Sequence, residues 1–142
     1  MDHEPTSDDL RRIYADTKTI AVVGASTDPD KAAHVIPAYL QAHGYRIIPV
    51  SPRGGEIFGE RVRTSLEDVD EPIDVVQVFR PPHEGGEVAK AAGASGAKVI
   101  WFQPGTSSEG GVRIAEDAGL TVVRERCMGV MHGALGLGPG PY

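Results

Sequence analysis

The length, composition and charge of this 142-residue chain exclude several classes of protein. Apolar residues make up 40% of it and charged residues 24%, which is typical of a globular chain and not of a disordered one. The formal net charge of −6 argues against nucleic-acid or anionic-membrane partners, because these need an extended basic surface. Every apolar run falls short of the ~20 residues that span a membrane.

The cysteine content and the first residues predict a cytoplasmic protein. Cys127 is the only cysteine, so an internal disulfide cannot form, and this fits a reducing compartment. The start of the chain is acidic and lacks the basic-then-apolar layout of a signal peptide. The histidines have no metal-ligand spacing, and we expect no metal site.

The first predicted element is a leading helix within residues 1–18. Leu10, Ile13 and Tyr14 recur at helical spacing, and Thr6 or Ser7 can cap the helix. Five β-branched-rich apolar runs then predict strands at residues 19–23, 46–50, 73–79, 98–102 and 120–123. Because these runs are nearly continuous and do not alternate, they are typical of parallel strands that are covered on both faces.

Helical patterns lie between the strands. We expect helices from about His34 to His43, from Pro82 to about Ala92, and from Glu109 to Gly119. The first of them places Pro37 in its opening turn, where proline is tolerated. Residues 106–109 read as a capping box for the third.

Two segments differ from this alternation. Residues 52–72 contain Ile57 and Phe58, a candidate short edge strand, and a helical turn at residues 65–68. Residues 134–142 are rich in glycine and proline, and we expect a flexible, unpacked tail there. The sequence thus predicts one α/β domain at residues 19–133, a Rossmann-like doubly wound, mainly parallel sheet with helices on both faces and strand order 3-2-1-4-5-6.

In such sheets ligands bind at the carboxyl ends of the strands, near the reversal of strand order. Four turn-forming stretches with small or polar residues follow the predicted strands. The candidate ligand-binding residues are Gly24, Ala25, Ser26, Thr27, Lys31, Ser51, Pro52, Arg53, Phe79, Arg80, Gln103, Pro104 and Gly105.

The first stretch is the candidate phosphate loop. Gly24 allows close approach of a backbone, Ser26 and Thr27 offer hydroxyl and amide donors, and Lys31 adds charge. The alternative is that Gly24 only makes a tight turn. The dinucleotide fingerprint of three spaced glycines does not occur after Gly24.

The second stretch bears on the ligand's ribose. An NAD site usually places a carboxylate after the second strand, whereas this chain has Ser51, Pro52 and Arg53 there. An arginine suits a phosphorylated ribose, either the 2′-phosphate of NADP or the 3′-phosphate of coenzyme A. Arg53 can instead be a solvated residue of a glycine-rich loop. Arg80 can reach a diphosphate or pair with Glu84.

Groups that could perform catalysis are hard to find. Cys127 and His132 could act as a thiolate and a base, but a single cysteine is more often packing. No hydrolase, zinc-protease or Walker motif occurs, and Trp101 is expected in the core.

Several stretches together resemble the small stand-alone CoA-binding protein family, which is similar to the CoA-binding domain of the succinyl-CoA synthetase α subunit. They are residues 23–26, 44–50, 65–68, 78–80, 96–103 and 126–128. The resemblance runs from Thr19 to about Gly133. It does not extend to the synthetase domain that carries a phosphorylated histidine, so His132 is not expected to take that role.

The resemblance implies a Rossmann-type fold that binds coenzyme A at the ends of its strands. It implies that residues 24–26 and Lys31 lie near the phosphates. By the same resemblance, residues 51–53 hold the adenosine end, and Phe79 and Arg80 form a wall of the crevice.

Three functions follow from these observations. The first is a module that binds coenzyme A or an acyl-CoA without chemistry of its own, beside an enzyme of acyl-CoA metabolism. The alternative is an NADP-dependent oxidoreductase, for which no proton donor or substrate pocket is visible. The third is a redox role in which Cys127 forms a mixed disulfide with the CoA thiol.

Overall fold

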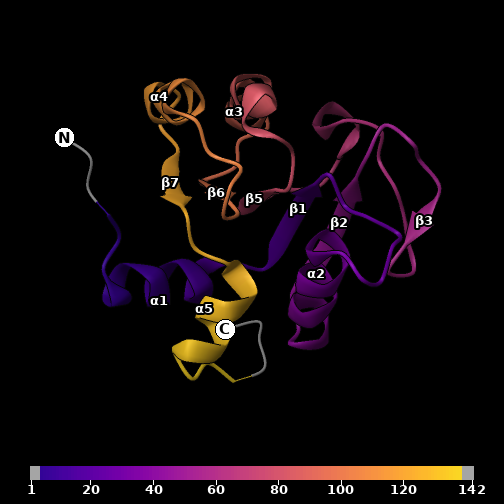
Figure 1. Cartoon of the computed structure of the whole chain (residues 1–142), viewed down its shortest axis with the longest axis horizontal. Helices are drawn as coiled ribbons and strands as arrows, with labels where there is room; N and C mark the ends of the chain where they lie inside the picture. The colour runs from indigo at the N-terminus through magenta and orange to yellow at the C-terminus, as the bar shows by residue number, and fades with distance from the viewer. Residues whose placement is uncertain (1–3, 139–142) are drawn as a thin grey trace.

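Five parallel strands form the centre of the molecule, in the order β2-β1-β5-β6-β7 (Figure 1). The structure is a computed structural model that describes residues 4–138. The strands are β1 (Thr19–Val23), β2 (Arg46–Val50), β5 (Val75–Val78), β6 (Val99–Phe102) and β7 (Thr121–Arg124). This confirms the predicted Rossmann-like α/β fold, because every pairing in the sheet is parallel and the order reverses beside β1.

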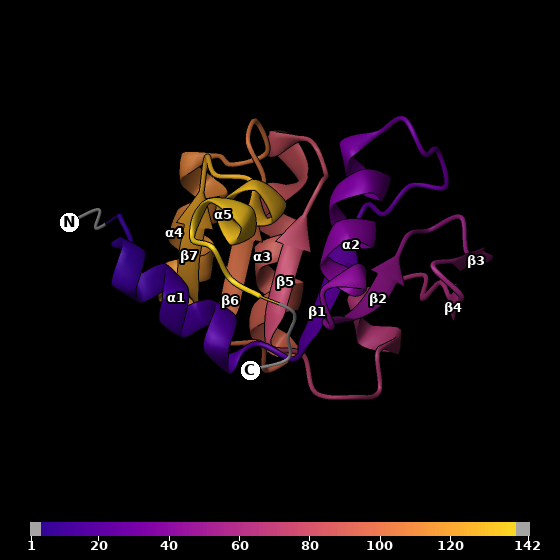
Figure 2. The same ribbon diagram turned by 90° about the horizontal axis from the view of Figure 1, so that it is seen from below.

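Helices cover both faces of the sheet, as Figures 1 and 2 show from two sides. They are α1 (Ser7–Asp16), α2 (Ala32–Ala42), α3 (Gly85–Ala94), α4 (Glu109–Asp117) and α5 (Met128–Ala134). The helices α3 and α4 pack on one face, and α1, α2 and α5 pack on the other. Successive strand residues serve opposite faces: Ile100 belongs to the core under α3 and α4, and Trp101 to the core under α1 and α5.

The register of the strands aligns their carboxyl ends. Val23 pairs with both Val50 and Val78, and Val78 pairs with Phe102. The residues that follow β1, β2, β5 and β6 therefore leave the sheet on the same side, at the carboxyl ends of the strands. We call this side the rim. The fold thus brings together the stretches that the sequence marked as candidate binding loops.

The prediction that Ile57 and Phe58 form an edge strand of the main sheet is wrong. Glu56–Ile57 (β3) instead forms a separate antiparallel hairpin with Glu60–Arg61 (β4), and Phe58 in its turn has a φ of 60°. The edge of β2 is contacted further along the chain, where Arg63 makes a single parallel bridge to Val50. Apart from this misplaced strand, the predicted order holds.

The helix α2 begins two residues before its expected start, so Pro37 lies in its second turn and not in its first. Proline has no backbone N–H, so the carbonyl of Ala33, four residues earlier, has no partner within the helix. The N–H of Ser26 donates to that carbonyl at 3.2 Å. The proline therefore leaves open a backbone acceptor that holds the loop after β1.

The helix starts follow from their caps. Thr6 and Asp9 form a reciprocal capping box at α1, as one of the two expected caps. The capping box expected at residues 106–109 is wrong: Ser108 caps α4 by accepting from the N–H of Gly111, and the Thr106 hydroxyl donates to the carbonyl of Gln103. Two short 3-10 turns, Leu66–Asp68 (η1) and Pro82–Glu84 (η2), complete the elements.

The segment expected to be an unpacked tail begins with the last turn of α5. Leu135 and Leu137 are partly buried and pack against the core, and the N–H of Leu137 donates to the carbonyl of His132. Leu135 and Leu137 thus depart from the expectation of an unpacked segment, whereas Gly136 and Gly138 are exposed; residues 139–142 lie outside the described part. Among the described residues, no helix is long and apolar enough to cross a membrane.

Candidate functional site

A pocket of about 200 Å³ opens at the rim between the ends of β1 and β2 and the start of α3. Its lining includes four of the candidate residues, Gly24, Ser51, Pro52 and Arg80. It also includes residues that the sequence did not mark as ligand-binding candidates, namely Thr64, Ser65, Leu66, Glu84, Glu87, Val88 and Ala91. Sites that enclose a whole drug-sized ligand usually have ~300–1,000 Å³, so this pocket can enclose one part of a nucleotide while the rest lies along the rim.

Gly24 shapes the pocket where the strand order reverses between β1 and β5. Its φ of +92° is in the left-handed region, which favours glycine. A Cβ at this position would lie 2.8 Å from the Arg80 Cδ and 3.3 Å from the Phe79 carbonyl carbon. The side chain of Arg80 therefore crosses directly over Gly24. Arg80 can lie there only because residue 24 has no side chain.

The loop after Gly24 has two uncommitted backbone donors. The N–H of Gly24 donates to the carbonyl of Val50, and that of Ser26 to the carbonyl of Ala33. Within residues 4–138, the N–H groups of Ala25 and Thr27 have no such partner. The Ser26 hydroxyl accepts from the N–H of Asp28 and still has its own proton to donate. The loop can thus offer alternate amides and one hydroxyl to an anion.

Two exposed cations flank this loop. Lys31 stands at the N-cap of α2, and Arg53 lies in the turn after β2, where its N–H donates to the Ser51 hydroxyl at 3.3 Å. Neither side chain has an ion-pair partner among the described residues. Arg53 directly follows Pro52 of the pocket lining but is not itself part of it, so its guanidinium is available to a group outside the pocket.

Arg80 is already paired. Its Nε donates to Glu84 Oε1 at 3.0 Å, and one terminal nitrogen donates to Oε2 at 2.7 Å, so the guanidinium and carboxylate form a two-bonded fork. These hydrogen bonds hold the pKa of the Glu84 carboxyl below its usual range. Arg80 was expected either to reach a diphosphate or to pair with Glu84, and the structure shows the pair with Glu84.

The stretch after β6 contributes differently from expectation. The Gln103 side chain is buried, and its Oε1 accepts from the N–H of Met128 at 2.9 Å and from the Gln77 amide at 3.2 Å. It therefore fixes the start of α5 and does not face the rim. Pro104 and Gly105 are exposed on the rim, and Gly105 has a φ of +81°.

The remaining candidates are parts of the walls. Ala25 is buried in the core, and Phe79 is partly buried against it. The lining residues that were not among the candidates lie in η1 and the two residues before it, at the end of η2, and in α3. Glu84, Val88 and Ala91 recur at helical spacing, a signal that marks one face of a helix but not what that face meets.

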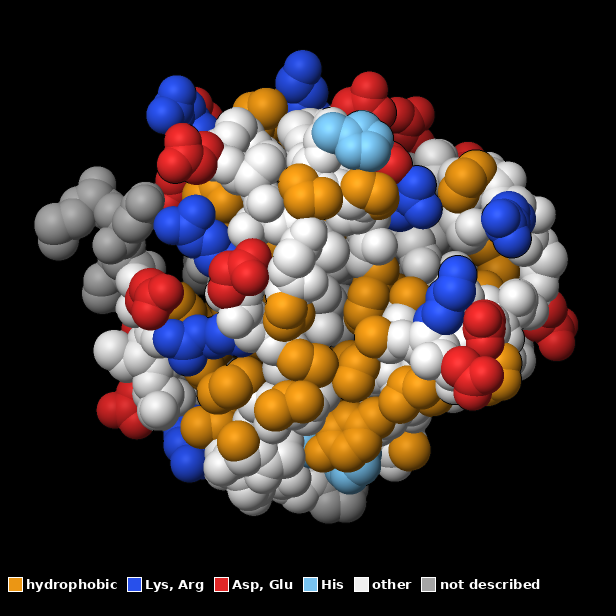
Figure 3. Space-filling model, in the orientation of Figure 1, with side chains coloured by type: hydrophobic (Ala, Val, Ile, Leu, Met, Phe, Trp, Pro, Cys, Tyr) orange, Lys and Arg blue, Asp and Glu red, His pale blue; other side chains and the backbone are white. Residues whose placement is uncertain are grey.

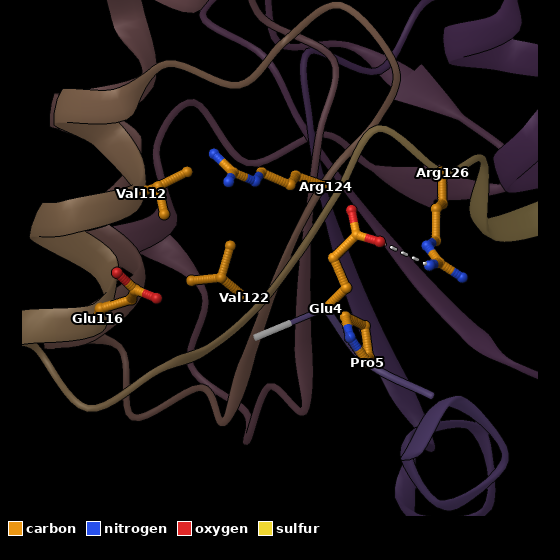
Figure 4. Close-up of a pocket in the computed structure, with 7 residues that line it drawn as sticks. All are labelled: Glu4, Pro5, Val112, Glu116, Val122, Arg124 and Arg126. Atoms are coloured by element: carbon orange, nitrogen blue, oxygen red, sulfur yellow. Dashed lines mark hydrogen bonds and ion pairs between the residues drawn. The ribbon is translucent and has the colours of Figure 1, made fainter. Parts of the chain in front are cut away.

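Two further hollows lie away from this rim. A small one of about 30 Å³ beside β7 is lined by Val122, Arg124 and the Glu4–Arg126 ion pair (Figure 4), and it has room for about one water molecule. A larger one of about 510 Å³ lies between α1 and α4, near Asp74 and Lys98. Although it is larger, it lies at the amino ends of the strands, opposite to where parallel sheets hold their ligands.

The surface carries no continuous basic area on the face shown in Figure 3, where Lys and Arg alternate with Asp and Glu. Apolar side chains gather over α2 and α5 on this face. Trp101 is fully buried, as expected, and its indole N–H donates to the carbonyl of Arg126. Cys127 is half-buried at the N-cap of α5.

Comparisons with known proteins show what the chain is similar to. A family model described as a CoA binding domain matches residues 18–133. The uncharacterized protein YneT of Bacillus subtilis is 36% identical over 128 residues, which cover 90% of this chain and 95% of YneT. The solved structure of a hypothetical protein from Pyrococcus horikoshii has a TM-score of 0.90 at 37% identity, covering 95% of this chain and 98% of that one.

A larger relative is an ADP-forming acetate–CoA ligase of Methanocaldococcus jannaschii. It is 27% identical over 123 residues, which cover 81% of this chain and 18% of the ligase. This chain therefore corresponds to one part of that enzyme.

Proposed function

Because the chain belongs to the CoA-binding domain family, we propose that it binds coenzyme A or an acyl-CoA along the rim, as a binding module without chemistry of its own. The observation that carries the proposal is the pocket between Gly24, Ser51 and Arg80, at the reversal of strand order. Parallel α/β sheets hold nucleotides at this place.

The groups at the rim suit the separate parts of the ligand. The uncommitted N–H groups of Ala25 and Thr27, with Lys31, suit the diphosphate. The pocket lining includes the apolar side chains of Val50, Leu66 and Val88, which suit an adenine ring. The exposed Arg53, next to Pro52 of the pocket lining, suits the 3′-phosphate, and the exposed Pro104 and Gly105 leave the rim open for the pantetheine arm.

The relatives support a place in acyl-CoA metabolism. The same domain makes up part of an ADP-forming acetate–CoA ligase, and this chain matches that part alone. We therefore propose that the module presents or senses CoA beside an acyl-CoA enzyme.

The test is a calorimetric and thermal-shift comparison of CoA, dephospho-CoA, NADP and NAD. CoA at a hundredfold excess over its Kd should stabilise the fold by about 2.7 kcal/mol, and the other ligands should bind more weakly. NADP as the tightest ligand would favour the oxidoreductase, since Arg53 suits its 2′-phosphate equally. If none of the four binds, the proposal is wrong.

A substitution separates the two ends of CoA. Arg53→Ala should weaken CoA about ten- to a hundredfold while leaving dephospho-CoA unchanged, because one charge-assisted hydrogen bond contributes about 1.5–3 kcal/mol. Arg61→Ala is the matched control, since Arg61 is also an exposed arginine but lies on β4, whereas Arg53 directly follows Pro52 of the pocket lining. Equal losses for both ligands would place the 3′-phosphate elsewhere.

A further inference from the structure

The pair formed by Arg80 and Glu84 has the chemistry of an occupied anion site. A carboxylate with two oxygens on one guanidinium makes the contacts that a phosphate would make with the same arginine. Both side chains remain partly exposed, 42% for Arg80 and 33% for Glu84, so water and solutes can reach the pair. An ion pair with this exposure is weak enough to be exchanged.

The position of the pair matters as much as its chemistry. The Arg80 side chain lies over Gly24, at the start of the loop whose Ala25 and Thr27 amides are uncommitted. Pro81 and Pro82, the second of which begins η2, lie between Arg80 and Glu84 and restrict the backbone there. Glu84 is therefore held close to Arg80 by a short, restricted segment of backbone.

We propose that Glu84 is an internal competitor that occupies Arg80 in the free protein and is displaced by the diphosphate of the ligand. This rests on the proposed function, and it deepens it by assigning a residue that sets affinity and selectivity. A ligand must offer Arg80 more than one carboxylate does, so a diphosphate exchanges with Glu84 and a weakly charged nucleoside does not. Once displaced, the Glu84 carboxylate lies beside the bound anion and weakens binding further by repulsion.

The opposite role for Glu84 predicts an opposite result. If Glu84 only held Arg80 in the orientation that the ligand needs, its loss would disorder the guanidinium and weaken binding. If Glu84 competes, its loss frees a guanidinium that Gly24 and the two prolines still keep at the rim. The sign of the change in affinity therefore separates the two roles.

The experiment is calorimetric titration of CoA into the wild type, Glu84→Gln and Glu87→Gln. Glu84→Gln should bind CoA roughly three- to tenfold more tightly, because it removes the competitor and keeps the shape of the side chain. Glu87→Gln removes the same charge from the same pocket without releasing Arg80, so its effect measures the general electrostatic gain, and Glu84→Gln should exceed it. Adding Arg80→Gln to Glu84→Gln should abolish the extra gain.

Two results would contradict the proposal that Glu84 competes with the ligand for Arg80. One is weaker or unchanged CoA binding by Glu84→Gln, and the other is an equal gain from Glu87→Gln. A wild type that fails to bind CoA would contradict the proposed function instead. In that case titration with inorganic pyrophosphate still decides the exchange: tighter binding by Glu84→Gln than by the wild type supports it, and equal or weaker binding overturns it.

Discussion

At the scale of single residues, Gly24 is a position of the site that does not tolerate a side chain. Its backbone is left-handed, and the space where a side chain would begin is taken by Arg80 and by the backbone of Phe79. The carbonyl carbon of Phe79 belongs to the chain leaving β5 and cannot move without disturbing the sheet. Both the absence of a Cβ and the positive φ are therefore needed here.

Gly24→Ala should lower the free energy of unfolding by about 2–3 kcal/mol. A left-handed alanine alone costs roughly 1–2 kcal/mol, and the contact with Phe79 adds to it. Gly119→Ala is the control, because Gly119 has a φ of +85° and no atom lies within 4 Å of the place that a Cβ would take. Urea unfolding of both variants checks this, and equal losses would mean that Arg80 and Phe79 give way without cost.

At the scale of elements, α5 is held by a buried aromatic cluster around His132. The His132 ring is fully buried; its Nδ1 lies 2.9 Å from the Tyr39 hydroxyl, and the rings of Tyr14, His43 and Tyr45 pack within 5.0–5.8 Å of it. Burial lowers the pKa of His132, as does the nearby His43, and a backbone hydrogen bond with Gly138 opposes the change. The cluster thus favours a neutral imidazole.

This makes the stability of the fold depend on pH below about 6.5, the usual pKa of histidine. As the pH falls through that value, the unfolded chain binds a proton at residue 132 before the native chain does, so the free energy of unfolding falls. The slope should approach about 1.4 kcal/mol per pH unit at most. Above about pH 6.5 this group adds no pH dependence.

Urea midpoints between pH 7.5 and 5.5 measure this slope. The carboxyls of Glu60 and Glu71 do not interfere, because hydrogen bonds from Arg46 lower their pKa values below this window. His132→Leu should flatten the slope, and His83→Asn, which changes an exposed histidine, should retain it. An equally steep slope in His132→Leu would place the titrating group elsewhere.

At the scale of the whole molecule, two cores share one sheet, and the leading helix belongs to one of them. Leu10 and Tyr14 of α1 are fully buried, and the Tyr14 hydroxyl donates to the carbonyl of Met128. The Tyr14 ring lies 5.7 Å from that of Trp101 on β6. The helix thus contacts β6 and α5 at once, so we expect α1 to unfold together with the sheet.

Leu10→Ala should therefore destabilise the entire fold by about 2–5 kcal/mol, as for other buried leucines. Unfolding should remain a single transition, with coincident curves from far-UV circular dichroism and from the fluorescence of Trp101, the one tryptophan of the chain. A leading helix that melts separately would instead give two transitions and leave the Trp101 curve at its wild-type midpoint.

Local patterns explain which elements could be predicted from the sequence. Apolar, β-branched runs such as residues 19–23 are recognisable as strands because both faces of the sheet are covered, so successive residues are all apolar. The wrong predictions concern places where a contact with a residue distant in the sequence determines the structure. Pro37 lies deeper in its helix than expected because Ser26 uses the acceptor that the proline leaves open, and Leu137 is packed because α5 returns to the core.

The sequence by itself determined the fold class and the side of the sheet where a ligand can bind, because both follow from the order of local runs and from the turn residues after them. Only the tertiary structure decided which side chains meet there. It brought Leu66 and α3 into the pocket, turned Gln103 into the core and joined Arg80 to Glu84. The physical reason is that local patterns specify a strand or helix, whereas contacts between side chains depend on how those elements pack.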